Sequence, residues 1–95
     1  MNTADIKVAL KDKTKSNETI NINSKYLIVV GSFGVKANAD RMLKHVQNNG
    51  IEATITLIRG LNRVVIASTN NEAEAEKLLD QFTHTFNEPA FILEQ

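Results

Sequence analysis

The 95-residue sequence contains no cysteine, which excludes disulfide bonds and thiolate metal sites. Its 11 basic and 11 acidic residues cancel, so charge gives no reason to expect nucleic acid or a membrane surface as a partner. No apolar run approaches the roughly 18 residues that a membrane-spanning helix needs, and the N-terminus lacks the apolar core of a secretory signal. We therefore expect one small domain without membrane insertion.

The first 25 residues differ in composition from the rest of the chain. Residues 11–24, KDKTKSNETININS, are polar and resist compact packing. Residues 4–10 alternate between apolar and polar side chains, a pattern that fits either a short strand or one helical turn. We predict a polar tail or linker over residues 1–25, with a possible extra strand, and a folded domain over residues 26–95.

The folded part alternates between strand and helix patterns. Apolar or alternating runs rich in β-branched side chains predict four strands, at residues 26–32, 52–58, 63–68 and 90–93. Apolar residues at helical spacing predict two helices, over residues 35–48 and from residue 70 to 83 or 84. The side chains expected to face the core are Ala39, Met42, Leu43, Val46, Ala75, Leu78, Leu79 and Phe82. Thr69 and Glu72 have the spacing of a capping box at the start of the second helix.

The two halves of the folded part resemble each other. Shifting the chain by about 36 positions overlays two strand–helix–strand units, with Val30 on Ile66 and Ser32 on Ser68. Two such units predict an α+β fold of the ferredoxin-like, split βαβ type, in the order βαββαβ. That fold has a four-stranded antiparallel sheet with both helices on one face. Its first and third strands are central, and these are the strands that are apolar on both sides.

No group of side chains predicts catalysis or a metal centre. The two histidines, His45 and His84, lie on different predicted helices without further ligands at metal spacing. The glutamates within residues 72–76 fall in the first turn of a predicted helix, where carboxylates stabilise the helix dipole. The Gly-Ser-Phe-Gly turn at residues 31–34 lacks the remaining residues of a nucleotide-binding loop. We expect no enzyme activity, no metal and no cofactor.

Three stretches of the folded part stand out together: YLIVVGSFGVKANADRMLKHVQNNGIEATIT, NRVVIASTNNEAEAEKLLDQF and AFIL. They resemble a SPOR domain (sporulation-related repeat) over residues 26–93, most specifically in VVGSF and NAD, and are closest to SPOR domains of Bacteroidetes-type bacteria. The resemblance implies a non-catalytic module of a bacterial cell-envelope or cell-division protein. Such modules bind peptidoglycan and favour glycan strands stripped of stem peptides. The implied location is the periplasm or cell envelope, with the targeting segment outside this chain.

The resemblance places the ligand on the sheet face opposite the helices, which we call the open face. Strand alternation predicts that this face carries Leu27, Val29, Gly31, Arg63, Val65 and Ala67. We also expect Ser32 near this face and Phe33 under the first helix. The predicted glycan-binding residues are Leu27, Val29, Ser32, Arg59, Arg63 and Val65. Arg63 is the best candidate, because a guanidinium can hold a lactyl carboxylate through two parallel hydrogen bonds. An equally open interpretation is that its stem covers the neighbouring valines.

The predicted open face is apolar, and the alternation places no aromatic side chain on it to stack on sugar rings. Many glycan-binding SPOR domains carry a polar residue where this chain has Val29. An apolar face of this kind marks an interaction site, so glycan, a second copy of the domain or residues 4–10 would cover it. The alternative function is therefore a protein-interaction or dimerisation domain. RNA binding on this topology needs stacking aromatics and a basic face, so we expect no nucleic-acid partner.

Overall fold

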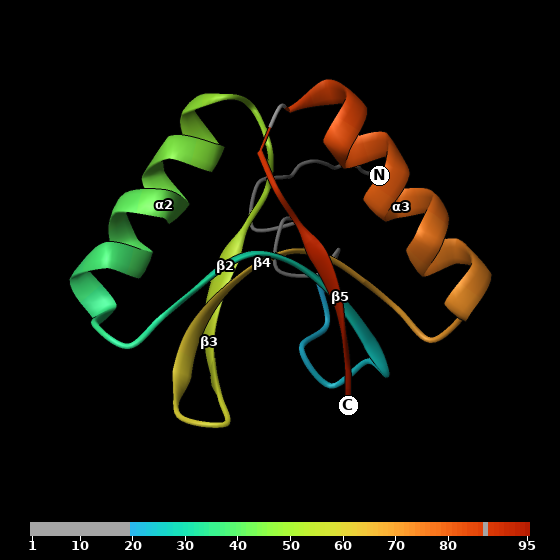
Figure 1. Cartoon of the computed structure of the whole chain (residues 1–95), viewed down its shortest axis with the longest axis horizontal. Coiled ribbons are helices and arrows are strands. Elements are labelled where there is room, and N and C mark those ends of the chain that lie inside the picture. The colour runs from blue at the N-terminus through green and yellow to red at the C-terminus, as the bar shows by residue number, and fades with distance from the viewer. Residues whose placement is uncertain (1–19, 87) are drawn as a thin grey trace, which may run out of the picture.

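The computed structural model describes residues 20–86 and 88–95, and Figure 1 shows its helices and strands. In chain order the elements are β2 (Tyr26–Phe33), α2 (Lys36–Asn48), β3 (Thr54–Ile58), β4 (Leu61–Thr69), α3 (Glu72–Thr85) and β5 (Phe91–Glu94). Each predicted strand and helix of the folded part is present, and its ends differ from the prediction by at most two residues. None of the described helices is both long and apolar enough to cross a bilayer.

The four strands form one antiparallel sheet in the order β3-β4-β2-β5. Figure 1 shows β2 and β4 as an arch, with α2 and α3 on its outer side and the β3–β4 turn and the C-terminus on its inner side. The strands that are apolar on both faces are central, and the mixed strands are at the edges. The predicted ferredoxin-like arrangement is confirmed.

The two helices begin differently. Helix α3 is capped by Asn71, whose side-chain oxygen accepts a hydrogen bond from the backbone N–H of Glu74 at 2.9 Å. The predicted capping box from Thr69 to Glu72 is wrong, because the helix starts two residues later at a stronger N-cap residue. The hydroxyl of Thr69 instead donates to the Glu74 carboxylate at 2.7 Å. Helix α2 starts after Val35, which makes no side-chain capping bond to any described residue.

The central strands β2 and β4 each contain one extra residue. The pairing register passes over Val30 in β2 and over Ile66 in β4. Each is therefore a β-bulge, which bends the strand and shifts the alternation of its side chains. Val30 and Ile66 are also the positions that the 36-residue shift overlays. The duplication itself stays a prediction.

The two bulges place two consecutive residues of each strand on the helix side of the sheet. Ala67 packs in a cluster with Ala75 of α3. A side chain on Gly31 would meet the ring of Phe33, which packs against the core under the first helix, as predicted. The predictions that Gly31 and Ala67 face the open side are therefore wrong, because strict alternation does not hold across a bulge.

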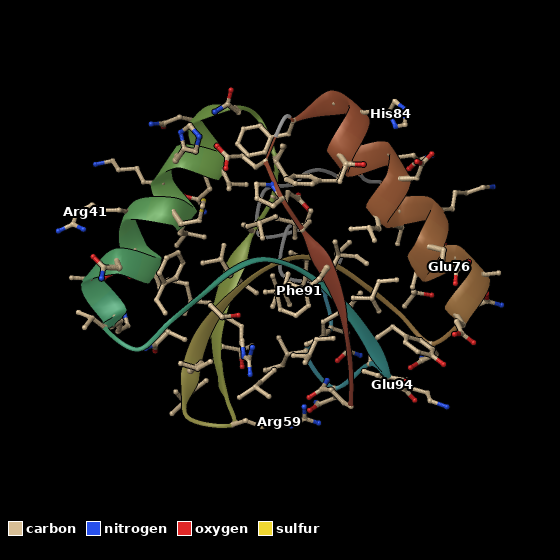
Figure 2. All side chains as sticks on the ribbon, in the orientation of Figure 1. Arg41, Arg59, Glu76, His84, Phe91 and Glu94 are labelled. Atoms are coloured by element: carbon tan, nitrogen blue, oxygen red, sulfur yellow. The ribbon has the colours of Figure 1, made fainter. Side chains whose placement is uncertain are left out.

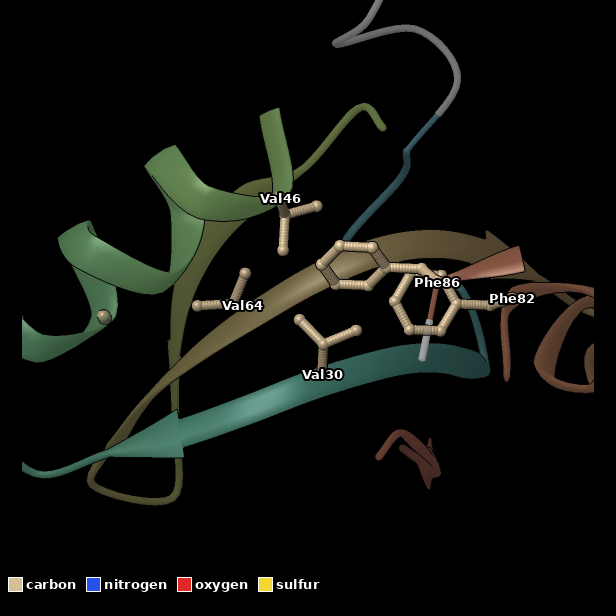
Figure 3. Packing of buried hydrophobic residues seen from close by; sticks show 6 residues of the cluster. Val30, Val46, Val64, Phe82 and Phe86 are labelled. Atoms are coloured by element: carbon tan, nitrogen blue, oxygen red, sulfur yellow. The ribbon is translucent and has the colours of Figure 1, made fainter. Parts of the chain in front are cut away.

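The main core lies between the sheet and the two helices. Figure 3 shows Val30 and Val64 of the central strands packed near Val46 of α2 and the rings of Phe82 and Phe86. The predicted core-facing side chains are confirmed in this cluster or in its neighbour beside α3: Ala39, Met42, Leu43, Val46, Ala75, Leu78, Leu79 and Phe82. The apolar stripes of both helices therefore face the sheet.

Phe86 joins the two helices at the end of α3. Its ring centroid lies 5.2 Å from that of Phe82 and 5.3 Å from that of His45 in α2. Phe86 is buried, although it follows the last residue of the helix. It therefore contributes aromatic packing between elements that are far apart in the sequence.

Candidate functional site

The open face carries an apolar cluster of its own. Leu27 and Val29 of β2 and Val65 of β4 pack together with Leu93 of β5 on this side of the sheet. The three predicted site residues among them are fully buried, each with 0 % of its surface exposed. These residues therefore lie on the predicted face and are covered within the chain itself.

Arg63 is the one charged side chain in the buried set of described residues, with 9 % of its surface exposed. Its Nε donates a hydrogen bond to the carbonyl oxygen of Ile58 at 3.2 Å, and its Nη1 donates to Ser32 Oγ at 2.9 Å. These bonds engage two of the five N–H donors of a guanidinium. Within residues 20–86 and 88–95, no carboxylate lies at ion-pair distance from Arg63. Buried charges ordinarily have a partner of opposite charge, and none of the described carboxylates supplies one to Arg63.

Hydroxyl groups flank Arg63 on both sides. In the pairing register Ser32 of β2 lies opposite Arg63, and Thr56 of β3 lies opposite it on the other side. Ser32 points to the open face because the bulge at Val30 shifts the alternation. Thr56 is not among the predicted site residues, although the alternation of residues 52–58 places it on the same face as Arg63.

An aromatic side chain also lies on the open face. Phe91 of β5 pairs with Val29 of β2, so the two side chains share one side of the sheet. Phe91 is 41 % exposed, and Figure 2 shows it at the start of β5. The prediction that this face carries no aromatic residue is therefore wrong. Phe91 and Leu93 are two residues apart in one strand, so they lie on the same side of the sheet. This spacing could have identified Phe91 from the sequence.

Arg59 lies at the rim of the open face, in the two-residue turn between β3 and β4. Arg59 and Gly60 have φ angles of 53° and 80°, as a type I′ hairpin requires. Ile58 and Leu61 pair on either side of the turn. The Nη2 of Arg59 lies 3.5 Å from the carbonyl oxygen of Glu94 in the opposite edge strand, which is a long hydrogen bond (Figure 2). The hairpin tip and the end of β5 therefore meet below the arch.

Residues 20–25, which we call the strap, contact the open face before β2 begins. Ile20 is buried in the cluster that contains Leu27, Val29 and Val65. The N-terminal domain boundary at residue 25 stays a prediction. The predicted extra strand at residues 4–10 lies outside the described residues, and so does its proposed role as a cover.

An apolar groove of about 240 Å³ lies on the other side of the sheet, beside α3. Its lining is uncharged and consists of Ile51, Ile66, Ala67, Leu78, Gln81, Phe82 and Thr85. A carboxylate in this groove would have no cation to pair with in the lining. This groove therefore does not suit an anionic ligand.

Each of the two histidines lies near one acidic side chain. His45 Nε2 lies 3.5 Å from a Glu88 carboxylate oxygen, and His84 Nδ1 lies 3.5 Å from the carboxylate of Asp80 one turn earlier. Across the described ranges, no group of three or more His, Cys, Asp or Glu side chains is placed to hold a metal ion. Each histidine therefore has a local acidic partner.

The model of the SPOR domain family matches residues 23–93, which is most of the chain. The chain belongs to the SPOR domain family. The membership predicted from the GSF and NAD pattern is confirmed. Among curated proteins, no match was found.

A solved structure has a similar fold. It is the solution structure of the peptidoglycan binding domain of the B. subtilis cell wall lytic enzyme CwlC. The two chains are 26% identical, with a TM-score of 0.58, and the match covers 74% of this chain and 87% of the CwlC domain. The similarity therefore includes most of both domains.

Proposed function

We infer that this chain is a non-catalytic module that binds peptidoglycan. The SPOR domain is a binding domain, and the similar domain of CwlC binds peptidoglycan. Peptidoglycan as ligand implies a site of action at the bacterial cell envelope. We propose the periplasm as the compartment and glycan strands without stem peptides as the preferred ligand.

The burial and surroundings of Arg63 support the open face as the binding surface. Arg63 is a buried cation on the open face, and within the described part of the chain it has no carboxylate partner. Glycan strands without stem peptides expose lactyl carboxylates. A guanidinium can bind such a carboxylate through two parallel, charge-assisted hydrogen bonds. Arg63 is therefore the proposed anchor of the glycan.

The surroundings of Arg63 suit a sugar polymer. Ser32 and Thr56, opposite Arg63 in the register, offer hydroxyl groups that can donate and accept hydrogen bonds. Phe91 offers an exposed aromatic ring on the same face, as sugar rings require for stacking. Arg59 at the rim supplies a second positive charge. We propose Leu27, Val29 and Val65 as the apolar floor of this site.

Replacing the guanidinium tests the proposal. We expect Arg63→Gln to weaken binding to glycan strands from amidase-treated sacculi by about 10- to 100-fold, because a hydrogen bond to a charged group contributes about 1.5–3 kcal/mol. Arg63→Lys should recover part of the affinity, since it restores the charge without the planar fork. Sedimentation with sacculi and titration with soluble strands measure both effects.

Arg41 provides the matched control. It lies exposed on α2, away from the open face, and its Nη1 donates to Asn38 Oδ1 (Figure 2). Arg41→Gln removes the same charge and should leave binding unchanged. Equal binding by wild type and a folded Arg63→Gln variant, verified by circular dichroism, would falsify the assignment of Arg63.

Homodimerisation through the open face stays a prediction. Sedimentation equilibrium measures it directly. A dimer that dissociates when glycan is added would show that glycan and a second copy of the domain use the same face.

A further inference from the structure

The strap runs along the end of the sheet and is held by side chains from three places. The backbone N–H of Asn21 donates to Ser68 Oγ at 2.7 Å, and that of Lys25 donates to Asn70 Oδ1 at 2.9 Å. The side-chain amide of Gln95 donates to the carbonyl oxygens of Ile22 and Ser24 at 2.6 and 2.8 Å. These contacts join the strap to the end of β4 and to the C-terminus.

Ile20 is the apolar contact between the strap and the open face. It is 6 % exposed and packs in one cluster with Leu27, Val29, Val65 and Leu93. Three of these residues form the floor of the proposed glycan site. A ligand on that floor and the Ile20 side chain would require the same space.

We propose that the strap is an autoinhibitory element, and that Ile20 must leave the open face before a glycan strand can occupy the whole site. The proposal rests on the peptidoglycan-binding function inferred above. Phe91 lies on the same face and is 41 % exposed, so a glycan can make a first contact there before the strap moves. The apparent affinity for glycan is then lower than the affinity of the open form, because only the molecules with an open strap can bind fully.

The contacts of the strap are of a kind that a ligand can displace. The bonds that anchor the strap through Asn21, Lys25 and Gln95 each pair a backbone group with a side chain, and most of them are exposed. One backbone bond, from Gln95 N–H to the Lys25 carbonyl oxygen at 2.7 Å, lies at the junction with β2. We expect this backbone bond to keep Lys25 in place as a hinge while Ile20 at the other end moves.

The substitution Ile20→Ser in the full chain tests this proposal, with Ile22→Ser as its control. Both remove the same apolar side chain from the strap, but Ile22 is 41 % exposed and its bond to Gln95 uses the backbone carbonyl. We expect Ile20→Ser to bind glycan strands from amidase-treated sacculi roughly tenfold more tightly than wild type, because more molecules are open. Ile22→Ser should bind like wild type.

The outcomes separate the two proposals. If wild type binds and a folded Ile20→Ser variant binds equally or more weakly, the strap is not inhibitory and the binding function stands. If neither protein binds, the peptidoglycan function fails and the strap proposal fails with it. Binding by Ile20→Ser alone supports both.

Hydrogen exchange gives a second measurement on the unmodified chain. The Asn21 amide is bonded to Ser68 in the closed strap, so its exchange should become faster when stripped glycan strands are bound. Slower or unchanged exchange of this amide in the complex would overturn the proposal, whatever the stability of the variants.

Discussion

Gly31 shows how one residue determines the orientation of its neighbours. A methyl group at this position would lie 2.7 Å from Cε2 of Phe33 and 3.7 Å from Cγ of Met42. The absence of a side chain therefore lets the Phe33 ring lie across β2 and under α2. The same local geometry directs Ser32 to the opposite face, where it accepts a hydrogen bond from Arg63.

We expect Gly31→Ala to lower the free energy of unfolding by about 1–3 kcal/mol, since overpacking forces a well-packed ring to move. Gly34→Ala is the matched control, because nothing lies within 4 Å of a side chain there. Urea denaturation of both variants measures the difference. Equal stability of the two would show that the Phe33 ring moves without cost.

The start of α2 is a place where one substitution should increase the stability of the fold. Its N-cap residue, Val35, has an extended backbone and a 59 % exposed side chain, and it makes no capping bond to any described residue. Helix α3 has such a bond from Asn71. Within the described residues, the first turn of α2 therefore lacks the side-chain acceptor that Asn71 supplies to α3.

A serine hydroxyl at position 35 should accept a hydrogen bond from a backbone N–H group in the first turn of α2. We expect Val35→Ser to be more stable than Val35→Ala by about 1 kcal/mol, the usual contribution of a serine N-cap. The alanine variant controls for loss of the valine side chain, so the pair isolates the capping bond. Thermal unfolding followed by circular dichroism compares them, and coincident curves would contradict the expectation.

The turn between β3 and β4 also has a residue that is not optimal for folding. Arg59 has a left-handed backbone that Asn or Gly adopts more easily. Its long side chain instead reaches Glu94 in the opposite edge strand. A residue retained in a strained turn is consistent with its proposed place at the rim of a binding site.

At the scale of the whole molecule, Phe86 holds the two helices together. It is 8 % exposed and packs against both Phe82 of α3 and His45 of α2. A domain of this size has only about 5–15 kcal/mol of total stability. One aromatic side chain between the halves is therefore a large part of what stabilises the fold.

Phe86→Ala should lower the free energy of unfolding by about 3–5 kcal/mol, because it removes a buried ring and leaves a cavity. Phe91→Ala provides a comparison with the same chemical change at a 41 % exposed position, where the expected loss is smaller. Guanidinium denaturation measures both. A similar loss in the two variants would show that Phe86 is not a bridge between the helices.

The sequence predicts the elements and their order well, because apolar periodicity reports directly which side of a strand or helix is buried. Leu27, Val29, Arg63 and Val65 lie on the predicted face. The predicted face was wrong for Gly31 and Ala67, which follow the two bulges. Bulges are determined by the pairing of two distant strands and leave no local signal in the sequence.

Two features of the site depend on contacts that no local pattern encodes. The predicted polar tail contains Ile20, yet this residue is buried against the open face. Arg63 was a good candidate by residue type, but its hydrogen bond to Ser32 required the bulge in β2. Tertiary structure therefore decided which polar groups come together.

The arch of the central strands depends on the two extra residues, Val30 and Ile66. If both were deleted, all the remaining side chains of β2 and β4 would keep their present faces. A bulge adds one residue on one side of the sheet and does not change the faces of the residues that follow it. The same amino acids would then line a flatter sheet. The curvature that would let this surface enclose a polymer chain is thus encoded separately from the chemistry that would recognise it.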